Sequence, residues 1–278
     1  MTKKMAVLIA GITMMATVTV LAATYYFQGF ETDTYDWSGA TRVASGTGGT
    51  TSAAGDFHAQ AANSAFTQFG GYESAFPSGG YTTTIDVYLN VGGGHANDTR
   101  FDWSSAISTP ANTHRRDFVF NAGFYNDSDA TGTGPRFVIS ASNNATRSGA
   151  FPKNPGRGPF AITQTGWYTF EHHFDNNGTG GLIVDMSISD ADGVLLNTWT
   201  LTDATDIIGT TVGGHRYGWF AIQEFAAGLA IDNVNLLSVN EATSVNACKN
   251  DGWKSLTRAD ASLFKNQGDC IQYVNTGK

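Results

Sequence analysis

Aromatic, amide and charged side chains alternate with apolar side chains along several short segments of this chain. A flat aromatic ring can cover the apolar face of a sugar, and amides, carboxylates and arginine can bond the sugar hydroxyls. Because successive strand residues point to opposite sheet faces, alternation places these side chains on the face away from the core. A merely solvated sheet face would carry the same residue types, so that interpretation stays open. The residues concerned are Tyr88, Asp86, Asn90, Arg116, Asn121, Trp167, Glu171, His173 and Asp185.

The adjacent histidines His172 and His173 would point to opposite faces of one strand, so they cannot easily chelate one metal ion. His172 shares its face with Phe170 and Phe174, which predicts a core histidine, whereas His173 lies beside Glu171 on the other face. No His-x-His or Glu-x-x-His pair indicates zinc, and no Gly-x-Ser-x-Gly motif indicates a serine hydrolase. These catalytic classes are therefore not favoured.

The candidate residues depend for their positions on a series of short alternating segments, each of which predicts a β-strand. Turn signals rich in Asn, Asp and Gly connect them, most clearly at 175–178 and 190–193. No helical periodicity of ten or more residues occurs among them. The sequence therefore predicts an all-β, antiparallel β-sandwich of the jelly-roll type. The predicted strands are 81–91, 116–125, 137–141, 167–175, 182–190, 195–201, 216–225 and 229–237.

The N-terminal segment differs from the rest of the chain. Two lysines at its start, an apolar run over 5–21 and two alanines after the run predict a signal peptide over 1–23. We therefore expect a secreted, extracellular protein with no stable membrane insertion after cleavage.

The sequence changes character again after the predicted sandwich, which we place at 24–239. The segment 240–278 contains the only two cysteines, Cys248 and Cys270. In an exported protein this pair predicts a disulfide, and closing a loop of this length would stabilise the folded state by about 3 kcal/mol. We expect a small C-terminal appendage closed by that bond.

Charge excludes one class of partner. The chain has 24 acidic and 16 basic residues, a net charge of −8, and removal of the two leader lysines would make it −8 − 2 = −10. Nucleic-acid binding needs clusters of Lys and Arg that neutralise phosphates, so we expect no nucleic-acid partner. A long loop at 142–160 is the exception, because it carries Arg147, Lys153 and Arg157 and no acid. We expect a monomer.

Two segments that each carry an acid lie at the ends of the predicted sandwich. Residues 27–37 read FQGFETDTYDW and residues 229–237 read LAIDNVNLL. This arrangement resembles the β-jelly-roll modules of secreted carbohydrate-active proteins, the concanavalin-like and carbohydrate-binding modules. The resemblance implies that the first and last strands pair, and that Glu31 and Asp232 share a structural Ca²⁺ ion, which takes carboxylate and carbonyl oxygens. The alternative is that both are strand-edge carboxylates without a metal.

The C-terminal segment has a resemblance of its own. Its Gly-Trp-Lys segment and its Phe-Lys-Asn-Gln-Gly-Asp-Cys segment are similar to a short cysteine-paired element at the end of many exported bacterial proteins. That resemblance implies bacterial export. It leaves open whether the appendage is a cell-surface tether or only a stabilising element.

The jelly-roll resemblance implies recognition of an extracellular polysaccharide. The first alternative is a polysaccharide-degrading enzyme, with β-elimination of a uronate-containing glycan preferred to hydrolysis; the lyase would use Arg116, His173 and Tyr125. The second alternative is a non-catalytic surface or structural protein. The same polar side chains would serve binding or catalysis, and we expect Arg116, Asn121, Glu171 and His173 to converge on one concave face. The expected substrate-binding residues are Tyr88, Asn121, Trp167, Glu171 and Asp185.

Overall fold

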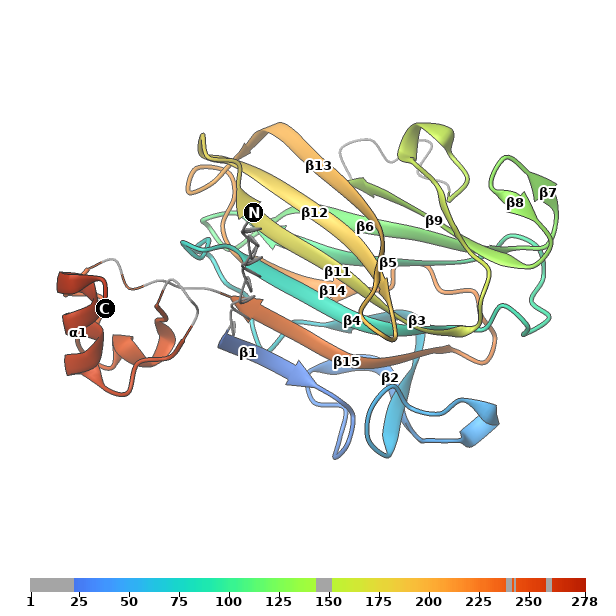
Figure 1. The fold of residues 1–278 in the computed structure, drawn as a ribbon, viewed down its shortest axis with the longest axis horizontal. Coiled ribbons are helices and arrows are strands. Elements are labelled where there is room, and N and C mark those ends of the chain that lie inside the picture. The colour runs from blue at the N-terminus through green and yellow to red at the C-terminus, as the bar shows by residue number, and fades with distance from the viewer. Residues whose placement is uncertain (1–22, 144–151, 239–241, 243, 259–261) are drawn as a thin grey trace, which may run out of the picture.

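Thirteen antiparallel strands form one continuous sheet that folds over itself into two packed layers (Figure 1). The computed structural model describes the chain outside residues 1–22, 144–151, 239–241, 243 and 259–261. The predicted all-β antiparallel sandwich is therefore confirmed. The leader prediction falls almost wholly outside the described residues. In the described part, no helix has the length and apolar character needed to cross a membrane.

The first layer has the order β10-β9-β6-β5-β14-β3, and we call it layer A. Strand β3 leads into the second layer, because its end pairs with β14 whereas its beginning pairs with β15. Ser64 has a φ of 64°, at the place in β3 where the pairing changes. The bounds are β3 Phe57–Thr67, β5 Thr99–Ser108, β6 His114–Tyr125, β9 Arg136–Asn143, β10 Phe160–Ile162 and β14 His215–Trp219.

The second layer has the order β15-β4-β11-β12-β13, and we call it layer B. At its edge β1 pairs with β15, so the first and last strands lie side by side as the resemblance implied. Strand β2, Trp37–Ala44, pairs with β3. Strands β7, Ser128–Asp129, and β8, Gly132–Thr133, form a separate short hairpin. The remaining bounds are β1 Ala23–Gln28, β4 Tyr81–Leu89, β11 Gly166–Asn176, β12 Gly181–Asp190, β13 Leu195–Ile207 and β15 Leu229–Ser238.

Aromatic rings fill the space between the layers. Phe120 of β6 lies with its ring centroid 5.1 Å from that of Phe170 of β11, and Phe118 lies 5.6 Å from Phe174. Each fully buried ring of this kind stabilises the fold by about 2–3 kcal/mol. His172 belongs to this core as predicted, since it is fully buried and its Nε2 lies 3.0 Å from the carbonyl oxygen of Phe118.

One predicted strand is shorter than expected. The segment 216–225 was predicted as a strand, but β14 ends at Trp219. Beyond it, Gln223 makes only an isolated bridge with Phe101. The chain bends at this point, and the side chains of Phe220 and Phe225 are both buried.

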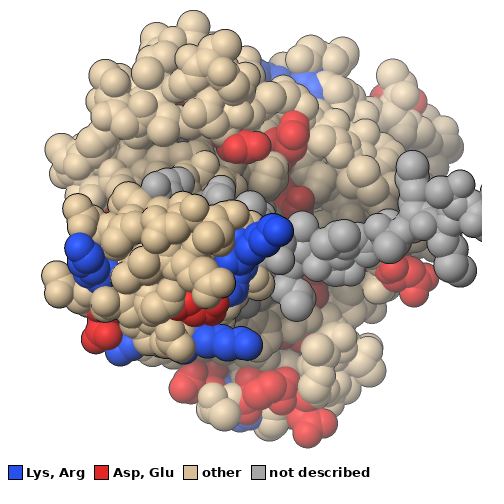
Figure 2. Space-filling model, turned by 60° about the vertical axis from the view of Figure 1, so that its left-hand side comes forward, with Lys and Arg blue, Asp and Glu red and all other residues tan. Residues whose placement is uncertain are grey.

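The C-terminal appendage has a small core of its own around the Cys248–Cys270 disulfide, which is present as predicted. Among its described residues is one α-helix, α1 (Gln267–Thr276), which is capped by Asn266, whose side chain accepts a hydrogen bond from the Asp269 amide. The appendage lies beyond the end of β15, apart from the sandwich (Figure 1). Figure 2 looks onto this end of the molecule. Most of the blue basic side chains in this view lie on the appendage, and most of the red acidic side chains lie on the sandwich around it.

A buried ion-pair cluster joins the two layers at the beginning of β6. Arg116 Nε lies 2.6 Å from Asp206 Oδ2, and Arg115 Nη2 lies 2.8 Å from Asp206 Oδ1. Asp203 lies 3.1 Å from Arg116 Nη2. The side chain of Asp206 is only 1% exposed, so its charge depends on both arginines for compensation.

Replacing this acid should destabilise the sandwich. In Asp206→Ala, the guanidinium of Arg116 would stay buried with only Asp203 beside it. We expect the free energy of unfolding to fall by about 3 kcal/mol, measured by urea denaturation. Asp192→Ala, in an exposed turn, is the control and should change it by less than about 0.5 kcal/mol. Equal midpoints for the two variants would contradict a structural role for the cluster.

Candidate functional site

Five of the eight residues predicted for catalysis or substrate binding lie on the outer face of layer B. Cross-strand register places them there, on β4, β11 and β12. Each contacts a neighbour on that face: His173 Nδ1 lies 2.9 Å from Thr82 Oγ1, and Trp167 Nε1 donates to the Thr51 carbonyl at 2.8 Å. The rings of Tyr88 and Trp167 lie 5.4 Å apart. The five residues are Tyr88, Trp167, Glu171, His173 and Asp185.

The other predicted residues lie elsewhere. Asn121 lies on the outer face of layer A, where its Nδ2 donates to Ser142 Oγ at 2.9 Å. Arg116 is in the buried ion-pair cluster. The structure therefore does not bring Arg116, Asn121, Glu171 and His173 to one face. Alternation tells which side of its strand a residue occupies, but it does not tell which layer the strand joins.

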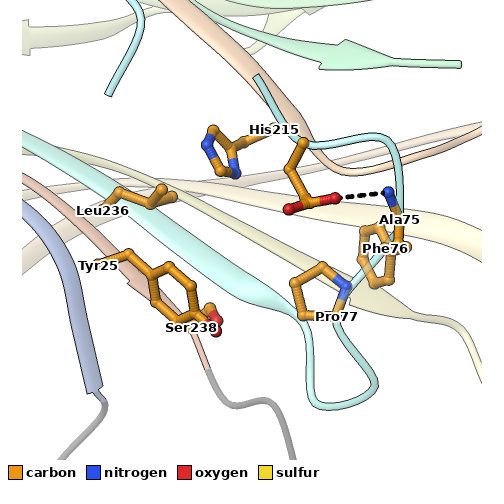
Figure 3. A pocket seen from close by; sticks show the side chains of 8 residues that line it. Tyr25, Ala75, Phe76, Pro77, His215, Leu236 and Ser238 are labelled. Carbon is orange, nitrogen blue, oxygen red and sulfur yellow. Dashed lines mark hydrogen bonds between the residues drawn. The ribbon is translucent and has the colours of Figure 1, made fainter. Parts of the chain in front are cut away.

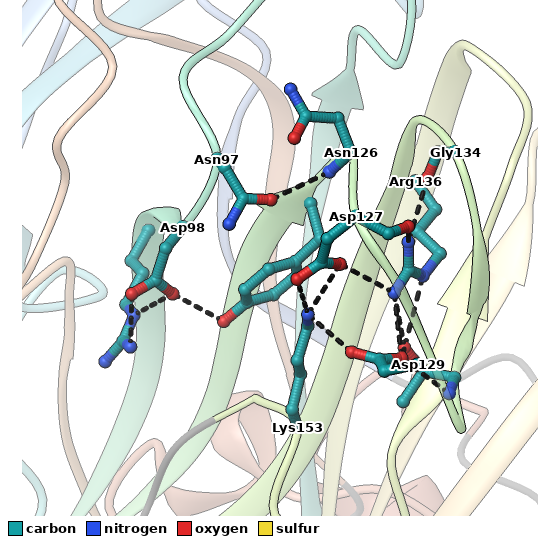
Figure 4. Close-up of polar contacts among 11 residues, drawn as sticks. Asn97, Asp98, Asn126, Asp127, Asp129, Gly134, Arg136 and Lys153 are labelled. Carbon is teal, nitrogen blue, oxygen red and sulfur yellow. Dashed lines mark hydrogen bonds and ion pairs between the residues drawn. The ribbon is translucent and has the colours of Figure 1, made fainter.

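Tyr125 is the last residue of β6 and contacts Asp98 and Lys153, which Figure 4 shows within a larger polar cluster. Its hydroxyl donates to Asp98 Oδ1 at 2.7 Å, and Lys153 Nζ lies 3.8 Å from the centre of its ring. Burial, and then the hydrogen bond to Asp98, raises the pKa of Tyr125 above its ordinary value. A phenol in this setting keeps its proton at neutral pH, so it is a poor general base.

The same cluster fixes the β7–β8 hairpin. Figure 4 shows Lys153 reaching Asp127 and Asp129, with Nζ to Oδ2 distances of 2.7 and 2.5 Å. The fully buried Arg136 bonds the same two carboxylates. Lys153, from the basic loop noted in the sequence, is thus paired with acids of the hairpin.

The outer face of layer A carries a group of rings that we call the aromatic row: Phe66, His114, Tyr217 and Trp219. The ring centroids of Phe66 and Tyr217 lie 5.3 Å apart, and those of His114 and Tyr217 lie 5.9 Å apart with nearly parallel planes. Trp219 stands almost perpendicular to Tyr217 at 6.3 Å. His114 is exposed and the other three are half-buried, so ring surface remains accessible.

Asp117 connects two members of the row. Its Oδ2 lies 3.2 Å from His114 Nε2, and its negative charge acts on the Tyr217 hydroxyl. Burial, and then the charge of Asp117, raises the pKa of Tyr217 above its ordinary value. Tyr217 is therefore protonated at neutral pH and can act as a proton donor.

A hollow of about 420 Å³ lies farther along, where the chain continues beyond β14. Its lining contains three side-chain amides, one hydroxyl and one carboxylate. The Gln223 side chain is largely buried, and its Nε2 donates to the Ala61 carbonyl at 2.7 Å. The Oε1 atoms of Gln223 and Gln60 have no hydrogen-bond partner among the described residues. The polar lining residues are Thr41, Gln60, Asn63, Gln223 and Glu224.

A second hollow of about 190 Å³ lies on the other side of the turn at 225–228 and shares Gln60 with the first. Tyr88 and Asn90 line it. Of the residues named from the sequence, these two are therefore the ones that line a described cavity. Tyr217 and Trp219 were not singled out, although their spacing of two within a predicted strand was a usable signal. No sequence signal places Phe66 in the aromatic row or Gln60 in the hollows, because their positions depend on which strands become neighbours.

Asp232 lies on β15, and Glu31 lies in the segment that follows β1. Asp232 Oδ2 accepts hydrogen bonds from the amides of Ala53 and Ala54, at 3.0 and 3.2 Å. The two Glu31 oxygens accept from the next amides along the same loop, those of Asp56 and Phe57. Together the two acids fix the loop before β3 against β15.

These contacts do not have the arrangement of a cation site. Asp232 Oδ1 accepts a further amide, that of Asn233, so backbone N–H groups face all four carboxylate oxygens. Among the described residues, no group of three or more His, Cys, Asp or Glu side chains could bind a metal ion. Calcium prefers six to eight oxygen ligands. Calcium binding by this pair stays a prediction.

No protein-family model matches the chain, and no curated protein matches it. Similar solved structures include a PL-14 alginate lyase from Aplysia kurodai, with a TM-score of 0.41, 12% identity, and coverage of 78% of this chain and 100% of that one. A CBM2 module of the evolved Dit of Lactobacillus casei BL23 phage J-1 has a TM-score of 0.41 and 10% identity, covering 78% and 96%.

An endo-β-1,4-glucuronan lyase from Trichoderma reesei has a TM-score of 0.42 and 5% identity, covering 78% of this chain and 96% of that one. TM-scores and identities this low say nothing about the function of this chain. Any functional conclusion must therefore come from its own residues.

Asp232 should make stability depend on pH. Burial raises its pKa from 3.8 to about 6, so the folded state binds a proton that the unfolded state has released. Its stabilising contribution is complete below about pH 4 and is lost as pH rises through about 6, a change of about 2–3 kcal/mol. We expect Asp232→Asn to remove this change in urea denaturation with EDTA present.

Adding calcium to the same denaturation experiment tests whether the Glu31–Asp232 pair binds a metal ion. If the Glu31–Asp232 pair binds Ca²⁺, millimolar calcium chloride should stabilise the wild type above about pH 6, where the acid is ionised, and should leave Asp232→Asn unaffected. An identical pH profile for wild type and variant in EDTA would contradict the structural role of the Asp232 proton.

Proposed function

We propose that this protein binds an extracellular polysaccharide along the outer face of layer A. The observation that carries the proposal is the aromatic row beside a hollow lined by amides. Accessible rings of Tyr217 and Trp219 offer apolar surface to sugar rings, and the exposed Asn63 and half-buried Gln60 line the hollow with amide groups that can bond sugar hydroxyls. The predicted leader puts this face outside the cell, which is part of the proposal.

The site has two separate contact regions, which suits a chain rather than a single sugar. Tyr217 lies on β14, whereas Gln223 and Glu224 line the hollow beyond the bend that follows Trp219. A bound polysaccharide would lie along β14, from the aromatic row to the hollow, and contact both. The walls of the hollow belong to three separate segments, so binding there needs the folded sandwich.

The charged side chains along the path from the aromatic row to the hollow favour a neutral glycan. Asp102, Asp117 and Glu224 all lie along it, and Glu224 Oε2 accepts a hydrogen bond from the Arg100 amide. The neighbouring Arg100 side chain pairs with Asp98 at 2.7 Å, so its charge is already compensated. Carboxylates can accept hydrogen bonds from sugar hydroxyls, but they repel uronate groups.

A second candidate function is β-elimination, and the His114–Asp117–Tyr217 arrangement favours it. His114 would take the proton from the carbon beside a uronate carboxyl group, and Asp117 would orient its ring. The bond to the leaving oxygen would break as a carbon–carbon double bond forms. Tyr217, which keeps its proton, would donate it to that oxygen. This assignment replaces the predicted base, His173, with a histidine on the other layer.

Ring truncation tests the binding proposal. We expect Tyr217→Ala and Trp219→Ala each to weaken polysaccharide binding by about tenfold or more, because central aromatic contacts contribute more than about 1 kcal/mol each. Affinity gels with a panel of neutral and uronate-containing polysaccharides measure this. Tyr35→Ala, which removes a 66% exposed ring between β1 and β2, is the control and should bind as the wild type does. Equal binding by all four proteins would contradict the proposal.

The conservative variant Tyr217→Phe separates the two functions. It keeps the ring and removes only the hydroxyl, so a binding protein should be affected by less than about threefold. A lyase should lose about a hundredfold or more in rate, measured from the ultraviolet absorbance of unsaturated product. His114→Gln should have the same effect on the rate. Wild-type protein that forms no unsaturated product from any uronate glycan would exclude the second candidate.

A further inference from the structure

A separate cavity of about 150 Å³ lies at the other end of the sandwich, between the edge of layer B and the loop that follows β3 (Figure 3). Leu236 and Ser238 of β15 form one wall, and Phe76 and Pro77 of the loop form another. His215, the first residue of β14, lies at its inner end with its ring toward the cavity. Neither the aromatic row nor the hollow includes any of these residues.

The hydrogen bonds of His215 determine what its ring can do. Its Nε2 lies 2.9 Å from the Gly71 carbonyl oxygen, which can only accept, so Nε2 carries the proton. Burial lowers the pKa of His215, and the ring is therefore neutral at neutral pH. Nδ1 then has a free lone pair, and it makes no hydrogen bond with the described residues. The cavity thus has a neutral nitrogen acceptor at its inner end.

Glu73 supplies a carboxylate. Its Oε1 accepts the amides of Ser74 and Ala75, at 2.9 and 3.1 Å, whereas Oε2 has no partner among the described residues. The backbone of Gly214 makes room for this side chain, since a Cβ there would lie 2.7 Å from Glu73 Cγ. The loop therefore holds one carboxylate oxygen, and because Glu73 is exposed the other oxygen is open to solvent or to a ligand.

Ser238 supplies a third oxygen. The residue is 4% exposed, and its Oγ is buried without a hydrogen-bond partner among the described residues. A buried hydroxyl without a partner costs free energy, which a ligand donor would recover. The cavity wall therefore provides three acceptors: Glu73 Oε2, His215 Nδ1 and Ser238 Oγ.

We propose that this cavity binds a small primary alkylammonium ion. The ammonium group has three N–H donors and one positive charge, which match three acceptors of which one is a carboxylate. The short alkyl chain would lie against Leu236, Phe76 and Pro77. The volume admits a molecule of a few carbon atoms, since cavities of about this size bind benzene-sized ligands. An anion would be repelled by Glu73, and an alcohol would satisfy only one acceptor.

Titration calorimetry of the full mature chain with n-butylammonium chloride tests the proposal. We expect saturable binding, with butan-1-ol, butyrate and tetramethylammonium each binding at least about tenfold more weakly. Tetramethylammonium has the charge without N–H donors, so it separates hydrogen bonding from simple charge attraction. Equal binding of tetramethylammonium or butan-1-ol would overturn the proposal, as would the absence of saturable heat with butylammonium.

Two variants locate the site. Glu73→Gln keeps the shape and an acceptor oxygen but removes the charge, and we expect about tenfold weaker binding of butylammonium. Ser238→Ala should weaken it severalfold. Asp192→Asn removes an acid from a distant exposed turn and should leave binding unchanged. Unchanged polysaccharide binding and an unchanged melting temperature confirm the fold of each variant, and wild-type butylammonium affinity in Glu73→Gln would overturn the assignment.

Discussion

The packing of aromatic rings between the two layers is the constraint on which the rest of the structure depends. Phe118 and Phe120 of β6 must face Phe170 and Phe174 of β11, so the inner faces of both layers are committed to the core. Polar chemistry is left to the outer faces, the ends of the sandwich and the loops. Because one continuous sheet makes both layers through β3, each layer offers its own outer face, and the two faces look in opposite directions.

The buried carboxylates Asp206 and Asp232 hold separate segments of the fold together. Asp206 compensates two arginines where the layers meet, and Asp232 accepts three backbone amides beside the first strand. A buried acid is stable only when charges or amide donors surround it, so such acids mark places where distant segments join. Glu73 differs, since one of its oxygens is bound by the loop and the other is available to a cavity. The proposed ammonium site depends on this second oxygen.

Sequence patterns predicted the strands well but not which polar side chains converge on one face, for one physical reason. The alternation of Ile85, Val87 and Leu89 reports the local environment of one strand, and the structure buries all three as predicted. Convergence of Asn121 with His173 required knowing that β6 and β11 belong to different layers, which depends on pairing between distant segments. The Cys248–Cys270 bond could be predicted because only two cysteines exist. The pairing of β1 with β15 followed from resemblance, not from periodicity.

Strand β14 carries residues of both proposed sites because its pairing with β5 is irregular. The register shifts between His215 and Gly218, which is the signature of a bulge. In a regular strand, His215 and Tyr217 would share a face, since they are two residues apart. The ring of His215 instead lies 6.0 Å from that of the buried Tyr81, whereas Tyr217 lies beside Phe66 and the exposed His114 on the outer face. Because of this irregularity, the side chain of His215 points into the end cavity and that of Tyr217 lies on the outer face. A change that made the pairing of β14 regular would therefore disturb both sites together.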